Sequence, residues 1–200
     1  SESFIEHVIS DSSDDVYTVY ASDMDSDGDM DVLSALGDGD KIAWYENDGN
    51  QNFTEKIISS SVDYGRDVYA ADVDGDGDMD ALSASSKNDK ISWHENDGNE
   101  SFTEHTISSS ANFARAVFSV DMDFDEDMDI LSASRDDDKI AWYENDGSES
   151  FTLHVISDSA DNAISVYAAD MDGDGDMDVL SASKDDDKIA WYENSKVIAL

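Results

Sequence analysis

The sequence predicts an all-β fold, namely a β-propeller of four blades with 49 residues each. The first observation behind this prediction is a regular repeat, since the four tryptophans Trp44, Trp93, Trp142 and Trp191 are spaced 49 residues apart. The second is that each repeat contains four short segments of β-branched, aromatic and small residues. No window long enough for a helix has a 3.6-residue apolar period. Four short strands repeated at this interval are typical of a propeller blade.

We expect a single propeller domain over residues 1–200, with repeats at residues 1–49, 50–98, 99–147 and 148–196. No linker or low-complexity segment separates the repeats, so the sequence gives no internal domain boundary.

The strands of the first repeat illustrate the pattern. The innermost strand ends with Val19–Ser22, and the second covers Val32–Ala35, beyond an acidic loop. The third strand runs over Ile42–Asn47 and the fourth over Phe53–Ser59. Between these two lies Asn47-Asp48-Gly49, which indicates a hairpin because these residue types accept the positive φ of tight turns.

The two ends of the chain predict how the ring closes. Residues 1–4 are identical to residues 148–151, which begin the fourth strand of a blade. The chain therefore starts with an outer strand, and it finishes near the third strand of its last blade. We expect the N-terminal strand to complete the last blade and close the ring. The alternative is donation of this strand to a neighbouring molecule, which would give a polymer of subunits.

The charge of the chain excludes several classes of partner. It has 50 Asp and Glu against 11 Lys and Arg, a formal net charge of −39. A nucleic-acid partner requires a basic surface, and so does attraction to anionic lipid. We expect neither nucleic-acid binding nor membrane insertion, since no apolar run reaches transmembrane length. The remaining question is what neutralises so many acids.

The acidic residues are most regular in four nine-residue loops, one in each repeat, with Asp at every odd position. The predicted metal ligands are Asp23, Asp25, Asp27, Asp29, Asp31, Asp72, Asp74, Asp76, Asp78, Asp80, Asp121, Asp123, Asp125, Asp127, Asp129, Asp170, Asp172, Asp174, Asp176 and Asp178. Positions 1, 3 and 5 turn into one concavity, while Gly at position 6 permits the bend. The carbonyl of position 7 and the carboxylate of position 9 complete an all-oxygen cage. Such a cage suits Ca²⁺ better than Mg²⁺, so we predict about one calcium ion per repeat.

Two details refine this prediction. A helical EF-hand would carry Glu at position 12 between helices, whereas this chain has Ser34 and its equivalents there, between strands. In the third loop Glu126 replaces the glycine and Phe124 replaces a small residue. A residue other than glycine is strained at positive φ, so we expect the third site to bind calcium more weakly.

The loop pattern Asp-x-Asp-x-Asp-Gly-Asp-x-Asp between strands, followed by Ile-Ala-Trp-Tyr-Glu-Asn-Asp-Gly, resembles the FG-GAP/VCBS repeat family over essentially the whole chain. This family includes the propeller heads of integrin alpha subunits and many bacterial extracellular proteins. The resemblance implies calcium-bearing blades, secretion or display at the cell surface, and a role in adhesion or ligand recognition.

The remaining polar residues give no catalytic constellation. His7, His105 and His154 share one repeat position with Lys56 on the predicted outer strand, where a structural role is favoured over chemistry. His94 replaces a tyrosine. Without a singular acid–base pair or an activated nucleophile, we expect the protein not to be an enzyme.

Arg66 and Arg115 share a repeat position with Tyr17 and Ile164, just before the innermost strand. They either line one mouth of the central channel or pair with nearby Asp.

The tryptophans raise a further alternative. Exposed aromatic rings could make the chain a multivalent glycan-binding lectin, but alternation places Trp44 and Tyr45 on opposite, buried faces of one strand. We therefore predict a calcium-binding, non-catalytic, extracellular recognition or adhesion module with an unidentified protein or glycan ligand. A self-assembling structural subunit is the first alternative, and a lectin is the second.

Overall fold

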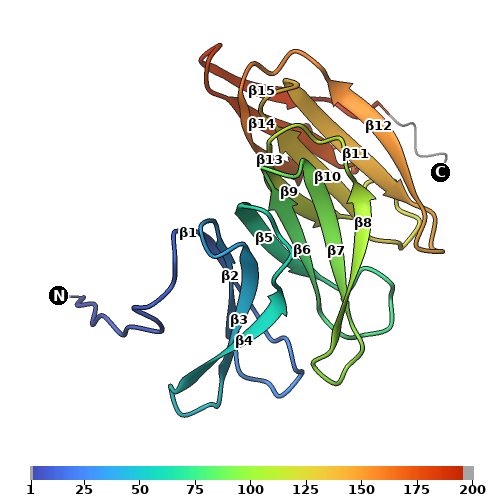
Figure 1. The fold of residues 1–200 in the computed structure, drawn as a ribbon. Coiled ribbons are helices and arrows are strands. Elements are labelled where there is room, and N and C mark those ends of the chain that lie inside the picture. The colour runs from blue at the N-terminus through green and yellow to red at the C-terminus, as the bar shows by residue number, and fades with distance from the viewer. Residues whose placement is uncertain (1, 196–200) are drawn as a thin grey trace.

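A computed structural model of the chain describes residues 2–195 (Figure 1). In this part of the chain 15 strands and no helix are present, and they form four antiparallel sheets in chain order. Accordingly, the described residues include no helix that is long and apolar enough to cross a membrane. The all-β class and the repeats of the sequence prediction are confirmed.

Each of the first three sheets takes three strands from one repeat and its outer strand from the start of the next repeat, and the fourth sheet has the three strands of the last repeat. The first contains β1 (Val16–Ser22), β2 (Asp31–Leu36), β3 (Lys41–Asn47) and β4 (Phe53–Ser59). The second contains β5 (Gly65–Ala71), β6 (Asp80–Ser85), β7 (Lys90–Asn96) and β8 (Phe102–Ser108). The third contains β9 (Ala114–Val120), β10 (Asp129–Ser134), β11 (Lys139–Asn145) and β12 (Phe151–Ser157). The fourth contains β13 (Ala163–Ala169), β14 (Asp178–Ser183) and β15 (Lys188–Tyr192).

The first strand of every sheet is the innermost one. Strand β1 packs against β5, β5 against β9, and β9 against β13. Equivalent aromatic residues on these strands form a continuous row: the ring centroids are 4.4 Å apart for Tyr20 and Tyr69, 5.0 Å for Tyr69 and Phe118, and 4.6 Å for Phe118 and Tyr167. The row defines the inner side of the arc in which the sheets follow one another (Figure 1).

The hydrophobic core lies between neighbouring sheets. Trp44 packs with Leu33 of its own sheet and with Ala81 of the second sheet. Tyr45, the next residue, packs on the opposite face with Leu36 and Ala43. The exposed fractions of Trp44 and Tyr45 are only 1% and 5%, so the predicted burial of both faces is confirmed.

The outer strands place one cationic or imidazole side chain over each buried tryptophan. The Lys56 ammonium lies 4.8 Å from the Trp44 ring centroid, and the His105 ring stacks on Trp93 with centroids 4.5 Å apart. His154 stacks in the same way on Trp142, at 4.6 Å. These three side chains also contact Glu46, Glu95 and Glu144, at 2.9, 2.7 and 2.6 Å. These contacts place the three side chains on the outer strands, where the sequence predicted them, and pack them against the tryptophans.

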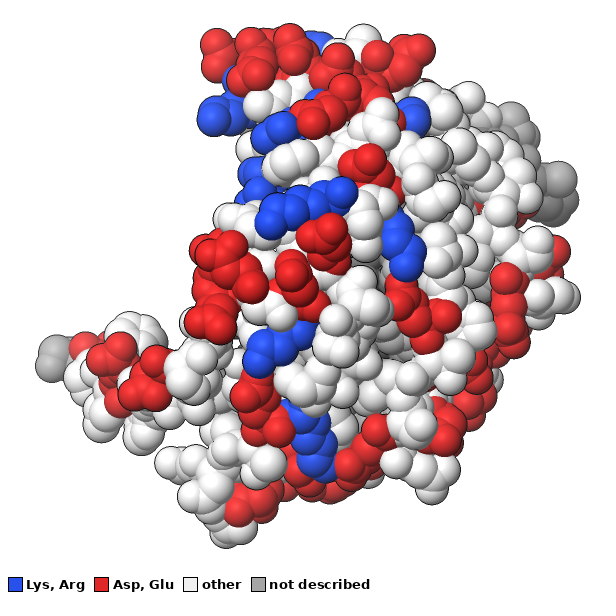
Figure 2. All heavy atoms as spheres, viewed as in Figure 1, with Lys and Arg blue, Asp and Glu red and all other residues white. Residues whose placement is uncertain are grey.

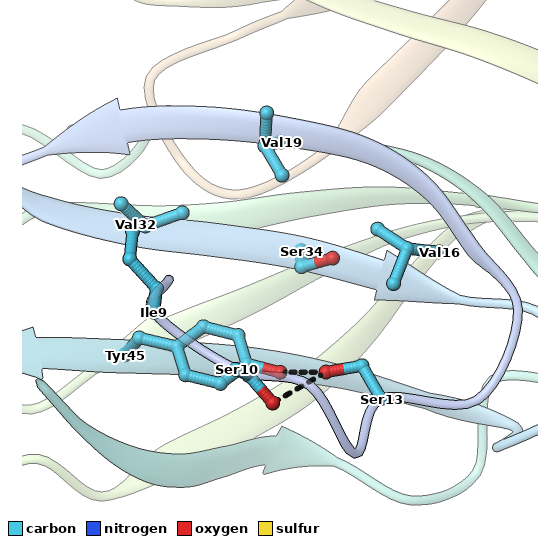
Figure 3. A pocket seen from close by; sticks show the side chains of 8 residues that line it. All are labelled: Ile9, Ser10, Ser13, Val16, Val19, Val32, Ser34 and Tyr45. Atoms are coloured by element: carbon cyan, nitrogen blue, oxygen red, sulfur yellow. Dashed lines mark hydrogen bonds between the residues drawn. The ribbon is translucent and has the colours of Figure 1, made fainter. Parts of the chain in front are cut away.

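The predicted closure by the N-terminal strand is not observed in the described residues. Residues 2–15 contain no strand, and the fourth sheet has three strands. Residues 9–13 lie instead over the first sheet, where Ser13 Oγ is 2.7 Å from the Tyr45 hydroxyl (Figure 3), while Phe4 and Ile5 are 97% and 79% exposed. This face of the first sheet has no preceding blade to cover it, and Ile9 borders the apolar pocket there beside Val32.

The opposite end of the arc is also uncovered. On β15, the exposed fraction is 46% for Trp191 and 86% for Ile189, whereas the equivalent Trp44 and Ile42 are 1% and 0% exposed. The four sheets therefore form an open arc, with the N-terminal segment at one end and β15 at the other (Figure 1).

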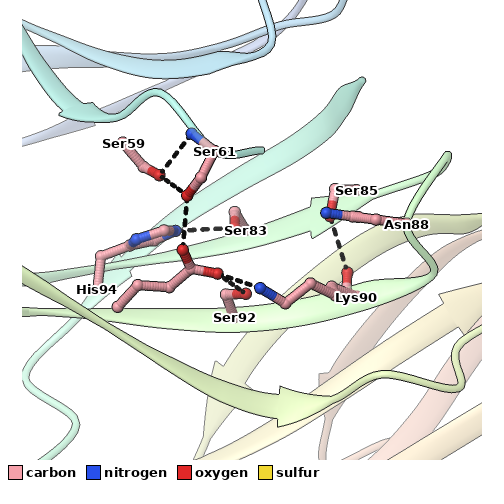
Figure 4. Close-up of polar contacts among 9 residues, drawn as sticks. Ser59, Ser61, Ser83, Ser85, Asn88, Lys90, Ser92 and His94 are labelled. Atoms are coloured by element: carbon pink, nitrogen blue, oxygen red, sulfur yellow. Dashed lines mark hydrogen bonds and ion pairs between the residues drawn. The ribbon is translucent and has the colours of Figure 1, made fainter. Parts of the chain in front are cut away.

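His94 departs from the repeat inside the second sheet. It lies on β7 with 1% of its surface exposed, and its Nε2 is 2.9 Å from Ser83 Oγ on β6 (Figure 4). Burial lowers the pKa of His94 to about 4. Nearby, burial acts to raise the pKa of Glu104, but hydrogen bonds from Lys90 and Ser61 outweigh it and lower that pKa to about 2.

We expect the His94→Tyr variant to be less sensitive to acid. The unfolded chain takes up a proton at the ordinary histidine pKa of about 6.5, whereas folded His94 does so only near pH 4. The folded state therefore loses stability as the pH falls through this window, by up to about 3 kcal/mol. Tyrosine, which occupies the same position in the other three repeats, removes this contribution. Urea unfolding of both proteins at pH 7 and pH 5 tests this, and equal pH dependence would contradict it.

Candidate metal centres

Each acidic loop joins the innermost strand of a sheet to its second strand. The first loop runs from Asp23 into the first residue of β2, Asp31, and the other three occupy the same place in their sheets. Acidic side chains form several patches on the face seen in Figure 2, and Lys and Arg lie among them. The loops thus add closely spaced carboxylates to a surface that is already acidic.

The structure brings three carboxylates together in every loop. In each set, one oxygen per residue lies within 4.8 Å of an oxygen of the other two. In loops two to four these residues come from positions 1, 3 and 9, and in the first loop from positions 1, 3 and 5. The sets are Asp23, Asp25 and Asp27; Asp72, Asp74 and Asp80; Asp121, Asp123 and Asp129; and Asp170, Asp172 and Asp178. Such sets could hold a metal ion.

Backbone hydrogen bonds curl the loop into the predicted concavity. In the first loop, the carboxylate of Asp23 accepts the N–H of Asp27 at 3.1 Å and the N–H of Gly28 at 3.0 Å. Asp25 also accepts the N–H of Asp27, at 3.2 Å. The position 1 carboxylate accepts the N–H of position 6 in all four loops. These bonds hold the carboxylates in place without any cationic side chain.

The aspartate at position 9 is the most buried acid of each loop. Asp80 has no exposed surface, and its two oxygens accept the N–H groups of Val73, at 3.0 Å, and of Asn96, at 2.8 Å. Burial raises the pKa of Asp80 to about 6, although the two hydrogen bonds lower it in part, and the same holds for Asp129. In the fourth loop the equivalent hydrogen bonds outweigh burial and lower the pKa of Asp178.

The position 7 carboxylates lie outside the converging sets. In the first three repeats they rest against the glycine of the hairpin turn, where a Cβ on Gly49 would be 2.3 Å from Asp29 Oδ2. Asp78 and Asp127 lie in the same way against Gly98 and Gly147. The glycine is therefore needed to make room for the carboxylate as well as for the turn. The position 5 residues Asp76, Asp125 and Asp174 are also outside these sets.

Asp176, at position 7 of the fourth loop, has a different environment. Only 2% of its surface is exposed, and its buried carboxylate oxygens accept no N–H or hydroxyl group of the described residues, since the group beside them is the carboxyl of Asp174. Burial, together with the charge of Asp174, raises the pKa of Asp176 to about 6. A buried carboxylate without donors is costly unless a cation compensates it, so this loop fits a metal ion.

The third loop has the backbone strain that the sequence predicted. Glu126 has a φ of 77° at position 6, where Gly28, Gly77 and Gly175 have values of 95° to 98°. Phe124, at position 4, also has a positive φ of 62°. Two side chains therefore occupy backbone conformations that glycine adopts without strain.

The asparagine that ends the third strand has a role beyond the hairpin turn that its sequence context predicts. Asn96 Nδ2 donates to the carbonyl of Met79 in its own loop and to that of Met24 in the preceding loop, each at 3.1 Å. Asn145 donates in the same way to Met128, at 3.3 Å, and to Val73, at 3.2 Å. Recurrence of Asn in all four repeats was the available signal, but it was interpreted only as part of a hairpin. Asn96 and Asn145 therefore link the second loop to the first and the third loop to the second.

The family comparison agrees with this geometry. A model described as an FG-GAP-like repeat matches residues 23–83, 72–132 and 121–181. Each match begins at the first aspartate of one loop and extends through the next loop into the strand that follows it. No match was found among the curated proteins.

Solved structures share the fold at low sequence identity. One is an Agrocybe aegerita lectin, described as recognising non-reducing terminal N-acetylglucosamine, with a TM-score of 0.58 and 18% identity over 82% of this chain. Another is BBS1N in complex with ARL6DN, with a TM-score of 0.60 and 11% identity over 92% of this chain. This chain spans 46% and 58% of the length of those two proteins.

We expect Glu126→Gly to stabilise the protein by about 1 kcal/mol, because glycine relieves the cost of a side chain at positive φ. The matched control is Gly77→Glu, which introduces the same side chain at φ 98° in the second loop and is expected to destabilise. Chemical denaturation in the presence of a chelator measures both effects without a contribution from metal. A destabilised Glu126→Gly protein would show that the loop backbone is not strained there.

Proposed function

We propose, since the chain belongs to the FG-GAP-like repeat family, that it is a calcium-binding recognition or adhesion module that acts outside the cell. The ions would be held by the converging carboxylates of the loops, foremost those at positions 1, 3 and 9. When bound, the ions would neutralise these charges and hold the loops in shape.

The observation that carries the proposal is the convergence of carboxylates without cationic partners. Asp72, Asp74 and Asp80 lie together, and no Lys or Arg forms an ion pair with them among the described residues. Oxygen donors in this number suit a hard cation that accepts many ligands, which favours calcium over transition metals. The orphaned carboxylate of Asp176 points to the same requirement.

An extracellular recognition role accords with the charge and with the neighbours. A net charge of −39 is tolerated best where calcium and salt are abundant. The fold is shared with a lectin, which supports a role in binding rather than chemistry. The histidines of the second and third sheets stack on tryptophan or are buried, so they support a non-catalytic module.

Calcium is expected to raise the thermal midpoint strongly relative to a chelator. A ligand at one hundred times its Kd stabilises by about 2.7 kcal/mol per site. For a chain of this size that corresponds to roughly 5–10 °C for each occupied site. Differential scanning calorimetry with calcium, magnesium or chelator tests this. An unchanged midpoint in calcium would remove the central claim, and an equal rise in magnesium would remove the preference for calcium.

We also propose that the N-terminal segment serves as the missing outer strand of a fourth sheet. His7 occupies the repeat position of His154, which stacks on Trp142 and contacts Glu144. In the fourth sheet, Trp191 takes the place of Trp142 and Glu193 that of Glu144, and both are exposed. The segment therefore carries the side chain that the open edge of β15 lacks.

A disulfide test distinguishes ring closure from strand exchange. The register of β11 with β12 pairs Tyr143 with Leu153, so the repeat places Glu6 opposite Tyr192. The chain has no cysteine, hence Glu6→Cys with Tyr192→Cys gives a single possible bridge within one chain, and each single variant alone shows how much dimer forms between like cysteines. A bridged monomer on non-reducing gels indicates a closed ring, and bridged dimers or larger species indicate exchange. Failure to form either bridge under oxidising conditions would contradict this placement.

A further inference from the structure

The arginines of this acidic chain gather at one place. All three, Arg66, Arg115 and Arg135, lie near the beginning of the inner strands or in the adjacent turn. Burial, followed by the charges of Arg66 and Arg135, lowers the pKa of Arg115. The three cationic groups are thus close enough to repel one another. Such a cluster is unexpected in a protein where acids outnumber bases by 50 to 11.

Two of these arginines line a pocket at one mouth of the arc. The pocket has a volume of about 310 Å³ and is formed by the second and third residues of β1, β5, β9 and β13. Arg66 and Arg115 are the second residues of β5 and β9. Of the two alternatives left open by the sequence, the structure therefore shows the arginines at the mouth of the channel.

The guanidinium of Arg66 is held in position by aromatic rings. Its Cζ lies 4.2 Å from the ring centroid of Tyr17, 4.4 Å from that of Tyr64 and 5.0 Å from that of Phe113. Its Nε donates to Ser86 Oγ at 3.1 Å. Cation–π contacts fix the plane of the guanidinium without neutralising its charge, so its outer N–H groups stay available to a ligand.

Neither Arg66 nor Arg115 forms an ion pair with a described residue. Arg135, by contrast, pairs with Asp136 at 2.6 Å. Asp67 is the acid that lines the pocket, but its oxygens accept the backbone N–H of Val68 at 3.1 Å and of Val117 at 3.0 Å. Two guanidinium groups therefore face a single carboxylate at this mouth, which leaves a net positive charge although acids are abundant elsewhere.

We propose that this pocket binds the carboxylate of a sugar acid. Guanidinium groups bind carboxylates through paired, charge-assisted hydrogen bonds. The hydroxyl of Ser165 lines the same pocket and suits a hydroxyl group of a sugar ring, whereas the Thr18 hydroxyl is hydrogen-bonded to Asp67. The inference names a ligand class for the recognition role proposed above and rests on that role. Salt screens charges beyond about 8 Å, so the acidic surface does not cancel the local attraction.

The test uses the calcium-loaded protein and D-glucuronate as the probe, with D-glucose and acetate as comparison ligands. Isothermal titration is expected to show binding of glucuronate, weaker binding of acetate and none of glucose. The Arg66→Tyr/Arg115→Ile double variant is expected to lose at least about tenfold in glucuronate affinity, since it removes both charge-assisted contacts. Both replacements occur at this position in the other repeats, as Tyr17 and Ile164, so the fold should tolerate them.

The control is Lys56→His, which introduces the residue of the second and third repeats on the outer strand. It should leave glucuronate binding unchanged. The inference is overturned if wild-type protein does not bind glucuronate, if the double variant binds it equally well, or if acetate binds as tightly as glucuronate. A normal calcium-dependent melt in such a case would leave the calcium-binding role standing, so the two failures are distinguishable.

Discussion

The structure depends on one buried carboxylate in each repeat, the aspartate at position 9 of the acidic loop. Asp80 accepts one N–H from its own loop and one from Asn96 at the end of the third strand. A desolvated carboxylate is tolerated when such donors satisfy its oxygens. The side chain of Asn96 then donates to the loop of the preceding sheet. A single polar chain of contacts therefore connects the loop, the hairpin and the neighbouring blade.

This arrangement couples metal binding to blade packing. The carboxylates that would hold an ion belong to the loops whose backbone carbonyls receive the asparagine bonds, for example that of Met24. Ordering one loop by a cation would therefore strengthen a contact of the next sheet. In repeat proteins each unit is stabilised mainly by its neighbours, so a local ion site can stabilise the whole array. The acidic residues of the loops would thus, with bound ions, stabilise the packing between neighbouring sheets.

The repeat period made the strands, the acidic loops and the positive φ of Glu126 predictable, because each depends on residues close together in sequence. Two features were not predictable in this way. The orientation of Asp29 depends on Gly49, which lies across the hairpin that follows β3. The open arc depends on where the N-terminal segment packs, because Ser13 contacts Tyr45 of the first sheet while β15 stays exposed, and no repeat unit specifies that choice. The missing closure and the position 7 carboxylates therefore required the structure.

Four residues differ in kind from their equivalents in the other repeats, and their surroundings indicate which differences concern stability and which concern binding. His94 replaces tyrosine, but its burial beside Ser83 gives it a partner and leaves no surface for a ligand. Glu126 replaces glycine and stores strain within its own loop. Arg66 and Arg115 differ from both, since they place two positive charges at an accessible pocket that contains one carboxylate, Asp67. A surplus of charge that faces a pocket suits a ligand of opposite charge, and for this reason these two departures support the proposed ligand.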